Sequence, residues 1–343
     1  MRKSLLPLIL SLAILFTACG AAQNAPGADA AADPSAQDAS ADAPAGTAPV
    51  FALTGRIEQQ VIFEQDGVSV TALSLEAAQR EGSDGVNSGV LTLNVHVENR
   101  SSRELLVKPF EFTVNGITTY GYDPAGYAAA GYSGDGYFIL GYTDNPPEWF
   151  KFHTLPALGI TDVAEVRFEM VLIDAESGET YSHAPVRIRT DLAASDTAPQ
   201  AEAAEIVYDG NGLRIACLGL TDDVAYPGEK AARIRLLMEN NTEQIIAVTL
   251  FGENGFDADV TVNGTAYRMD RASLTTFPSP LYEILPGAAL YTDIYIGRDD
   301  FAQFGLASVF DIRSFSCRFQ VNAADFRYNE ENLFITPDVH FAF

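Results

Sequence analysis

The chain has 343 residues, a length that suggests about two or three domains, and 47% of them are hydrophobic, which is enough to form a buried core. It carries 46 acidic and 21 basic residues, a formal charge of −25. Such a chain repels phosphate backbones, so nucleic acid is excluded as an expected partner. The well-solvated surface of an exported protein accounts for the charge.

The first residues have the pattern of an export signal. Arg2 and Lys3 supply positive charge, and the apolar run 5–16 has the length of a signal-peptide core and is too short to span a bilayer comfortably. The run ends in FTACG, which resembles the bacterial lipobox, where small residues precede a cysteine that is lipidated and becomes the new N-terminus. Phe16 stands where the lipobox usually has leucine. An ordinary secretory signal with a coincidental cysteine is the alternative.

We therefore expect a lipoprotein signal peptide over residues 1–18 and lipid attachment at Cys19, with the protein anchored extracytoplasmically to the bacterial cell membrane. Loss of two bases and no acids would take the formal charge from −25 to −27. No later stretch is apolar enough for a transmembrane helix, so the lipid would be the anchor. Residues 19–52, rich in Ala, Asp and Pro, cannot bury enough apolar area to fold, which predicts a disordered tether.

The remainder of the chain repeats itself. Four short segments recur in the same order, with offsets of 145, 141, 148 and 149 residues: 66–70 matches 211–215, 97–101 matches 238–242, 113–116 matches 261–264, and 162–166 matches 311–315. The third match is the identical sequence TVNG. Residues 193–204, rich in Ala, Asp, Pro and Gln, indicate a linker. The repeat therefore predicts two domains, over residues 53–192 and 205–343.

Both copies have the patterns of short β-strands. Residues 90–97 alternate between apolar and polar, with His96 on the solvent side, and residues 315–321 alternate strictly, which turns the odd-numbered side chains inward. Asp-Gly and Asn-Gly pairs supply the positive φ angles that tight hairpins need. Only residues 299–304 and 147–152 suggest single helical turns. About seven or eight short strands per copy are typical of a β-sandwich.

The order of these turn motifs, after a lipobox and an acidic linker, resembles that of the immunoglobulin-like domains of bacterial surface lipoproteins of unknown function. The resemblance covers residues 53–343 and implies an all-β fold with two tandem immunoglobulin-like β-sandwich domains after a signal peptide and disordered linker. It also implies a non-catalytic extracellular module. One departure is the Pro286-Gly287 turn, which has no Pro-Gly counterpart in the first copy.

The sequence contains no recognisable catalytic or metal-binding motif. None of the four histidines, His96, His153, His183 and His340, has a second ligand at a metal-site spacing. Nucleophile-elbow, phosphate-loop and dinucleotide fingerprints are absent, and no acidic segment follows the calcium-loop pattern. We expect no catalytic residues, metal or cofactor. A hydrolase is a less favoured alternative, because the sequence has no motif for one. It stays open, because a catalytic pair of carboxylates converges in space and leaves no pattern in the sequence.

Cys217 and Cys317 are the cysteines beyond the lipobox. Export makes a disulfide between them chemically possible, and two buried free thiols are the alternative.

The stretch 121–142 repeats Gly-Tyr every five residues, a period that suits neither a helix nor a strand. Turns at 123–126 and 133–136 would leave three strands, 117–122, 127–132 and 137–142, in a meander. Tyr122, Tyr127 and Tyr142 would then form a row on one face, with Tyr132 and Tyr137 paired on the other. The candidate ligand-binding residues are Tyr120, Tyr122, Tyr127, Tyr132, Tyr137, Tyr142 and Trp149. Cross-strand packing of the tyrosines is the alternative.

Two hypotheses for function follow. The first is a lipid-anchored binding or adhesion module of the bacterial cell envelope, whose partner is a cell-wall glycan or an envelope protein and whose tyrosines form the ligand face. The second is a structural or scaffolding lipoprotein without a ligand of its own.

Replacing Cys19 by Ser should move the protein from the membrane fraction to the soluble extracytoplasmic fraction, because the lipid then has no acceptor thiol. Fractionation and intact-mass measurement check this. A membrane-bound Cys19→Ser chain would contradict lipidation, and the neighbouring Thr17→Ser change is the matched control that keeps a small residue before the cysteine.

Overall fold

The computed structural model describes residues 51–81, 87–121, 126–193, 204–224, 230–253, 257–270, 282–324 and 330–343. All of them belong to one compact unit, residues 47–343. They form an all-β structure with a few helical turns, as the sequence predicts, and none of their helices is long and apolar enough to cross a membrane. Residues 51–193 are called the N-terminal half below, and residues 204–343 the C-terminal half.

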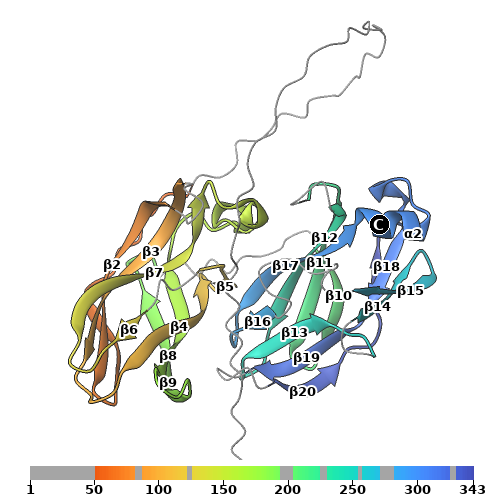
Figure 1. The fold of residues 1–343 in the computed structure, drawn as a ribbon. Helices are drawn as coiled ribbons and strands as arrows, with labels where there is room; N and C mark the ends of the chain where they lie inside the picture. Colours follow the sequence, from red (N-terminus) through yellow and green to blue (C-terminus); the bar gives the residue numbers. More distant parts are fainter. Residues whose placement is uncertain are drawn as a thin grey trace, which may run out of the picture. The chain divides into compact units, whose positions relative to one another are not determined.

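The N-terminal half is built from two layers of antiparallel strands. One layer has the order β1-β2-β3-β7, and the other β5-β4-β8-β9, with β6 paired to β4. In Figure 1 the layer with β2, β3 and β7 faces the layer with β4 and β8. The elements are β1 (Gln60–Gln65), β2 (Val68–Glu81), β3 (Asn87–Asn99), β4 (Leu105–Val114), β5 (Ile117–Thr118), β6 (Tyr127–Ala128), β7 (Ser133–Asp144), η1 (Glu148–Phe150), η2 (Pro156–Leu158), β8 (Glu165–Asp174) and β9 (Thr180–Arg189).

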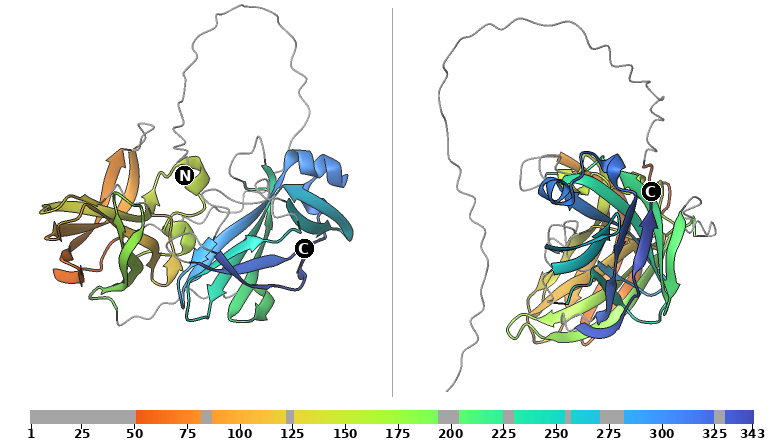
Figure 2. Two further views of the ribbon diagram at one scale, coloured as in Figure 1. Left: turned by 60° about the horizontal axis from the view of Figure 1, so that its bottom comes forward. Right: turned by 90° about the vertical axis from the view of Figure 1, so that its right-hand side faces the viewer.

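In the C-terminal half the strands β10-β11-β12-β17 continue through the β17–β5 pair into β5-β4-β8-β9, so that both halves share one nine-stranded sheet, which includes β6. Two further four-stranded sheets, β16-β13-β19-β20 and β15-β14-β18-β21, complete this half. The short helix α2, of seven residues, directly follows β17 and contacts β12 and β17 (Figure 2). The elements are β10 (Glu205–Gly210), β11 (Leu213–Thr221), β12 (Lys230–Asn240), β13 (Ile246–Leu250), β14 (Asp257–Val262), β15 (Thr265–Asp270), β16 (Tyr282–Ile284), β17 (Ala289–Gly297), α2 (Arg298–Phe304), η3 (Val309–Asp311), β18 (Ser314–Cys317), β19 (Phe319–Ala324), β20 (Glu330–Ile335) and β21 (Val339–Ala342).

Each half has its own hydrophobic core, one drawn from residues 63–188 and one from residues 213–341. The strict alternation at 315–321 does turn its odd-numbered side chains inward, and all four are at most 3% exposed. The segment is nevertheless two strands, because β18 ends at Cys317, β19 begins at Phe319, and the two belong to different sheets. Arg318 is the point where the chain changes sheet, and its side chain faces outward.

The predicted tight turns are present. Asp66, Asn115, Asn211 and Asn263 all have φ near +50°, and the glycine after each has φ near +80°. Positive φ at both central residues is the type I′ turn that suits the twist of a hairpin. The helical turns expected near 299–304 and 147–152 are α2 and η1.

A buried asparagine ends the third strand of each half and fixes the loop that follows. The Asn99 carboxamide donates to the carbonyls of Arg103 and Ala128, both at 2.8 Å. Asn240 donates in the same way to Gln244 at 2.9 Å and Ile284 at 2.7 Å. Each side-chain oxygen accepts from the backbone and hydroxyl of the residue two positions on. Since both asparagine side chains are fully buried, these bonds satisfy carboxamide groups that water does not reach.

The predicted meander at 117–142 is wrong. The first two segments are only the two-residue strands β5 and β6, which both pair with β4, and the third lies within β7, which pairs with β3. Tyr142 therefore lies opposite Val90 and Tyr137 opposite Asn94, so neither faces another tyrosine across the sheet. The predicted turn at 133–136 is the beginning of β7.

The repeated glycines explain the error, because they serve different purposes. A Cβ on Gly121 would lie 2.1 Å from the carbonyl oxygen of Ile139, and one on Gly126 would lie 2.0 Å from that of Val107. These glycines let two backbones touch. Gly131 instead has φ +76° and begins a bulge opposite Asn99. A single five-residue period thus hides two structural requirements.

The two halves are joined through backbone groups near Gly116 and Gly287. The Ala289 amide donates to the Gly116 carbonyl at 2.8 Å, which brings β17 beside β5 in parallel. The Arg167 guanidinium donates to the carbonyls of Pro286 and Gly287, both at 3.2 Å. The Pro286-Gly287 turn therefore lies at the junction of the halves.

A pair of glutamates also lies at this junction. Glu111 of β4 has φ +49° at the point where the β4–β8 register shifts, and its carboxyl group is hydrogen-bonded to that of Glu283 in β16. Burial, then the charge and hydrogen bond of Glu283, raise the pKa of Glu111 to about 8, and Lys108 opposes this weakly. At neutral pH the pair therefore holds a proton.

Replacing Asn240 by Ala should lower the free energy of unfolding by about 2–4 kcal/mol, since the buried Ile284 carbonyl loses its donor and the loop at Gln244 and Thr242 loses its side-chain hydrogen bonds. Urea denaturation measures the change. Asn241→Ala is the matched control: its side chain is exposed, and the expected change is within about 0.5 kcal/mol. Equal effects at both positions would contradict the role assigned to Asn240.

The Glu111 pair predicts that stability falls as the pH rises. Because the pKa is raised in the folded chain, the folded state binds the proton more tightly than the unfolded state. The contribution is complete below the unfolded value of 4.5 and is lost progressively up to about pH 8. Glu111→Gln keeps a neutral hydrogen-bonding group and should flatten the decline in Tm between pH 5 and pH 8. An unchanged Tm profile would refute this assignment.

Candidate functional site

The strand pairing that would place Tyr127 opposite Tyr142 is absent, because β6 pairs with β4 and β7 pairs with β3. Tyr142 is 8% exposed and packs its ring 5.1 Å from that of Phe150. The Tyr120 ring is half-buried and meets His153 edge-on at 4.7 Å. Tyr122 lies outside the described residues, as do the side chains of Tyr127 and Trp149. Two of the candidate residues are therefore packing residues of the interior.

The two remaining tyrosines lie near the β3–β7 pair. Tyr132 is 38% exposed, and its ring closes over the bare backbone of Gly134. The Tyr137 ring is half-buried and carries the Arg80 guanidinium 4.3 Å above its centre. Tyr132 packs on a glycine of its own strand, and Tyr137 packs against an arginine. The described tyrosines therefore provide no continuous aromatic surface.

Cys217 and Cys317 are free thiols in the structure, and both are buried. The structure therefore has the second of the two expected arrangements, two buried thiols, and not the candidate disulfide. They lie on β11 and β18, in opposite layers of the C-terminal core. Burial raises the pKa of both thiols, which keeps them protonated and unreactive. Cys19 lies outside the described residues. Among the residues that are described, no group of three or more His, Cys, Asp or Glu side chains is placed to hold a metal ion.

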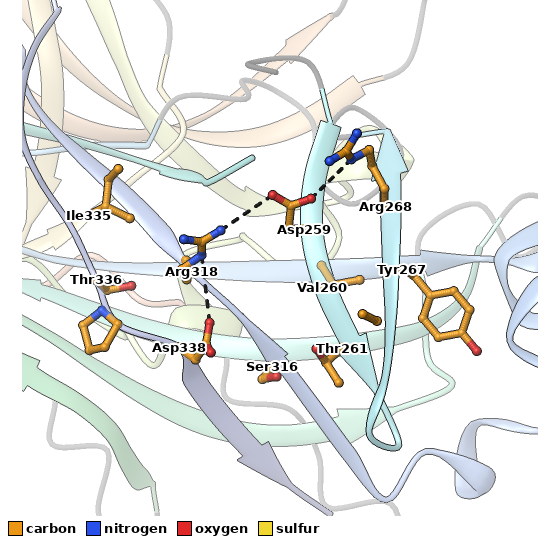
Figure 3. A pocket seen from close by; sticks show the side chains of 12 residues that line it. Asp259, Val260, Thr261, Tyr267, Arg268, Ser316, Arg318, Ile335, Thr336 and Asp338 are labelled. Atoms are coloured by element: carbon orange, nitrogen blue, oxygen red, sulfur yellow. Dashed lines mark hydrogen bonds and ion pairs between the residues drawn. The ribbon is translucent and has the colours of Figure 1, made fainter. Parts of the chain in front are cut away.

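A groove of about 960 Å³ lies in the C-terminal half (Figure 3). It crosses the outer face of the sheet β15-β14-β18-β21 and is closed on one side by the segment that joins β20 to β21. It is an open groove and not an enclosed cavity. The lining residues are Asp259, Val260, Thr261, Ala266, Tyr267, Arg268, Ser316, Arg318, Ile335, Thr336, Pro337 and Asp338.

Charged side chains line one end of the groove in a chain of alternating sign. Asp259 accepts from Arg268 Nε at 3.3 Å on one side and lies 3.7 Å from Arg318 Nη2 on the other. Arg318 Nε lies 3.9 Å from Asp338, as the dashed lines in Figure 3 show. The Arg318 guanidinium also stacks 4.5 Å from the centre of the Phe251 ring. These contacts orient two guanidinium groups toward the groove.

Hydroxyl groups form the floor of the groove beside these charges. Thr261 of β14 lies directly opposite Ser316 of β18, so both hydroxyls point outward from the same row of the sheet. Thr336 at the side is buried and accepts a hydrogen bond from the Phe319 amide at 2.9 Å. Ile335 provides an exposed apolar rim. The groove therefore offers hydroxyls, carboxylates and guanidinium donors to a polar ligand, without a nucleophile paired to a base.

The sequence interpretation missed this groove. Strand alternation places Asp259, Arg268 and Arg318 on outer faces, and that signal is present in the sequence. What the sequence does not contain is the pairing of β14 with β18, two strands more than fifty positions apart. The chain changes sheet at Arg318, and this places the Arg318 side chain near Asp259. The alternation of residues 315–321 gives no sign of that change.

Comparisons with known proteins identify no family for this chain. No protein-family model matches it, and no curated protein matches. Among solved structures, a crystal structure of the YadV chaperone matches at 14% identity over 73% of this chain and 92% of the other, with a TM-score of 0.19. At that score the similarity supports no conclusion about function.

Proposed function

We propose that this protein is a lipid-anchored, extracytoplasmic binding protein of the bacterial cell envelope. Its anchor would be a diacylglyceryl group on Cys19, and residues 19–52 would hold the folded part away from the membrane. The lipobox-like sequence and the export signal before it support the anchor. The excess of acidic residues is compatible with an exported, well-solvated surface.

The folded part would consist of two tandem immunoglobulin-like β-sandwich domains. Equivalent hydrogen bonds in the two halves support the repeat, beginning with Asn99 and Asn240. Asn115 and Asn263 provide a second pair: each donates to a carbonyl, of Asp162 at 3.0 Å and of Asp311 at 2.9 Å. Each also accepts from the two backbone amides that begin the next strand. Matching tertiary bonds at matching motifs are expected of duplicated domains.

The ligand site of the proposal is the groove in the C-terminal half, in place of the tyrosine row. The observation that carries it is the convergence of Arg268, Arg318 and Asp259 above a floor of hydroxyls. Such mixed donors and acceptors suit a polyhydroxylated ligand. The open shape suits part of a polymer better than an enclosed small molecule. We therefore propose a cell-wall glycan as the ligand class.

Retention of the full, detergent-solubilised chain on purified cell-wall polysaccharide tests this proposal. Arg268→Ala combined with Arg318→Ala should weaken retention at least about tenfold, because losing about 1.4 kcal/mol of binding is a factor of ten. The fold should survive, since exposed ion pairs contribute only about 0–1 kcal/mol. Arg313→Ala, an exposed arginine outside the groove, is the matched control.

Two outcomes would overturn the groove as the ligand site. If the double variant binds as well as the unchanged protein, the ligand lies elsewhere on the chain. If the unchanged protein is not retained on polysaccharide or by any envelope fraction, the scaffolding hypothesis is supported.

A further inference from the structure

A second polar cluster lies in the N-terminal half, on the outer face of the sheet that contains β3 and β7. His96 of β3 is paired with Asp135 of β7, and Glu98 is paired with Ser133. Residues two apart on a strand share a face, so strand pairing alone brings these four side chains together. Val95 and Val97, the neighbours of His96, point into the core. The cluster therefore rests on a rigid sheet.

The distances within the cluster are those of a nucleophile, a base and an orienting acid. His96 Nδ1 lies 2.6 Å from Asp135 Oδ1, and Ser133 Oγ lies 3.2 Å from His96 Nε2. A carboxylate that accepts the Nδ1 proton leaves Nε2 as the acceptor for the serine hydroxyl. Glu98 Oε1 is 3.8 Å from Nε2, but Glu98 is bonded to Arg100, which offsets its charge.

The backbone around Ser133 holds this geometry in place. The Gly131 amide donates to the Asn99 carbonyl, and the Asn99 amide donates to the Tyr132 carbonyl, both at 2.8 Å, which locks the beginning of β7 against β3. Asn99 is itself fixed by its buried carboxamide. The Tyr132 ring covers Gly134, the residue between Ser133 and Asp135. A serine on such a fixed strand is positioned before any substrate arrives.

We infer that Ser133, His96 and Asp135 form a catalytic triad that hydrolyses carboxylic esters with small acyl groups. The cluster is open to solvent: His96 has 33% of its side chain exposed. Asp135 has 75% of its side chain exposed, so the triad lies on an open surface, which suits a small acyl group. This site lies in the other half of the chain from the proposed glycan groove and does not depend on it.

The reaction proceeds in two balanced steps. Ser133 Oγ adds to the ester carbonyl carbon while its proton passes to His96 Nε2. The bond to the alcohol oxygen then breaks, and the alcohol leaves with that proton. Water next adds to the acyl-serine and gives one proton to Nε2, and the acid leaves as Ser133 recovers the proton. Asp135 holds the imidazole in the required tautomer and stabilises its charged form.

Two probes test the triad on the full chain: a fluorophosphonate, which forms a P–O bond to an activated serine with loss of fluoride, and p-nitrophenyl acetate. We expect fluorophosphonate to label one serine, mapped by mass spectrometry to Ser133. Ester hydrolysis should fall about 10²-fold in Ser133→Ala, the lower end of what general-base catalysis supplies. Asp135→Asn should slow hydrolysis and change its pH profile.

Ser69→Ala is the control, because Ser69 lies across from Glu98 on β2 and is outside the triad. It should leave both labelling and hydrolysis unchanged. Absence of label on Ser133 in the folded, unchanged chain would overturn the inference, as would a Ser133→Ala rate equal to that of the unchanged protein. The labelling result decides the question even if a variant fails to fold.

Discussion

The pairing register of β3 with β7 is the constraint on which the N-terminal half depends. Side chains alternate along a strand, so a slip of one position would exchange every inward and outward residue. In the observed register Val95 and Val97 enter the core, while His96 and Ser133 share the outer face. The bulge at Gly131, opposite Asn99, prevents that slip. The two hydrogen bonds at this bulge therefore help to set which side chains of β3 and β7 face the core, which form the polar cluster, and where Tyr132 lies.

Much of the fold could be predicted from the sequence because its strongest signals are local. An Asn-Gly pair requires positive φ angles wherever it occurs, so the hairpin turns were predictable residue by residue. Alternation at 315–321 likewise depends only on the segment itself. The Gly-Tyr stretch failed because a glycine has several uses. Whether Gly126 turns the chain or admits the backbone of Val107 depends on a strand about twenty residues away, which a period cannot reveal.

The candidate sites were less predictable for a related reason. Alternation indicates that Arg318 and His96 face outward, but it does not indicate what lies beside them. Their partners come from strands that pair across long separations: Asp259 for Arg318, and Asp135 for His96. The tyrosines show the opposite failure, since an aromatic residue is suited equally to a binding surface and to a core. Only packing against Phe150 and His153 assigns Tyr142 and Tyr120 to the interior.

The junction between the halves combines backbone hydrogen bonds with buried polar side chains that lack good hydrogen bonds. His153, Arg233 and Asp293 are all buried there, yet His153 Nε2 and Arg233 Nη1 lie 3.4 and 3.8 Å from Asp293 Oδ2, too far for good hydrogen bonds. Buried charges at such distances recover little of their desolvation cost. The junction is therefore stabilised by the Gly116 and Arg167 hydrogen bonds and by apolar packing, while its ionic groups oppose burial. The Glu111–Glu283 pair makes the stability of this contact depend on pH. The aliphatic and phenylalanine side chains of the two cores carry no titratable group, so their packing does not have this dependence.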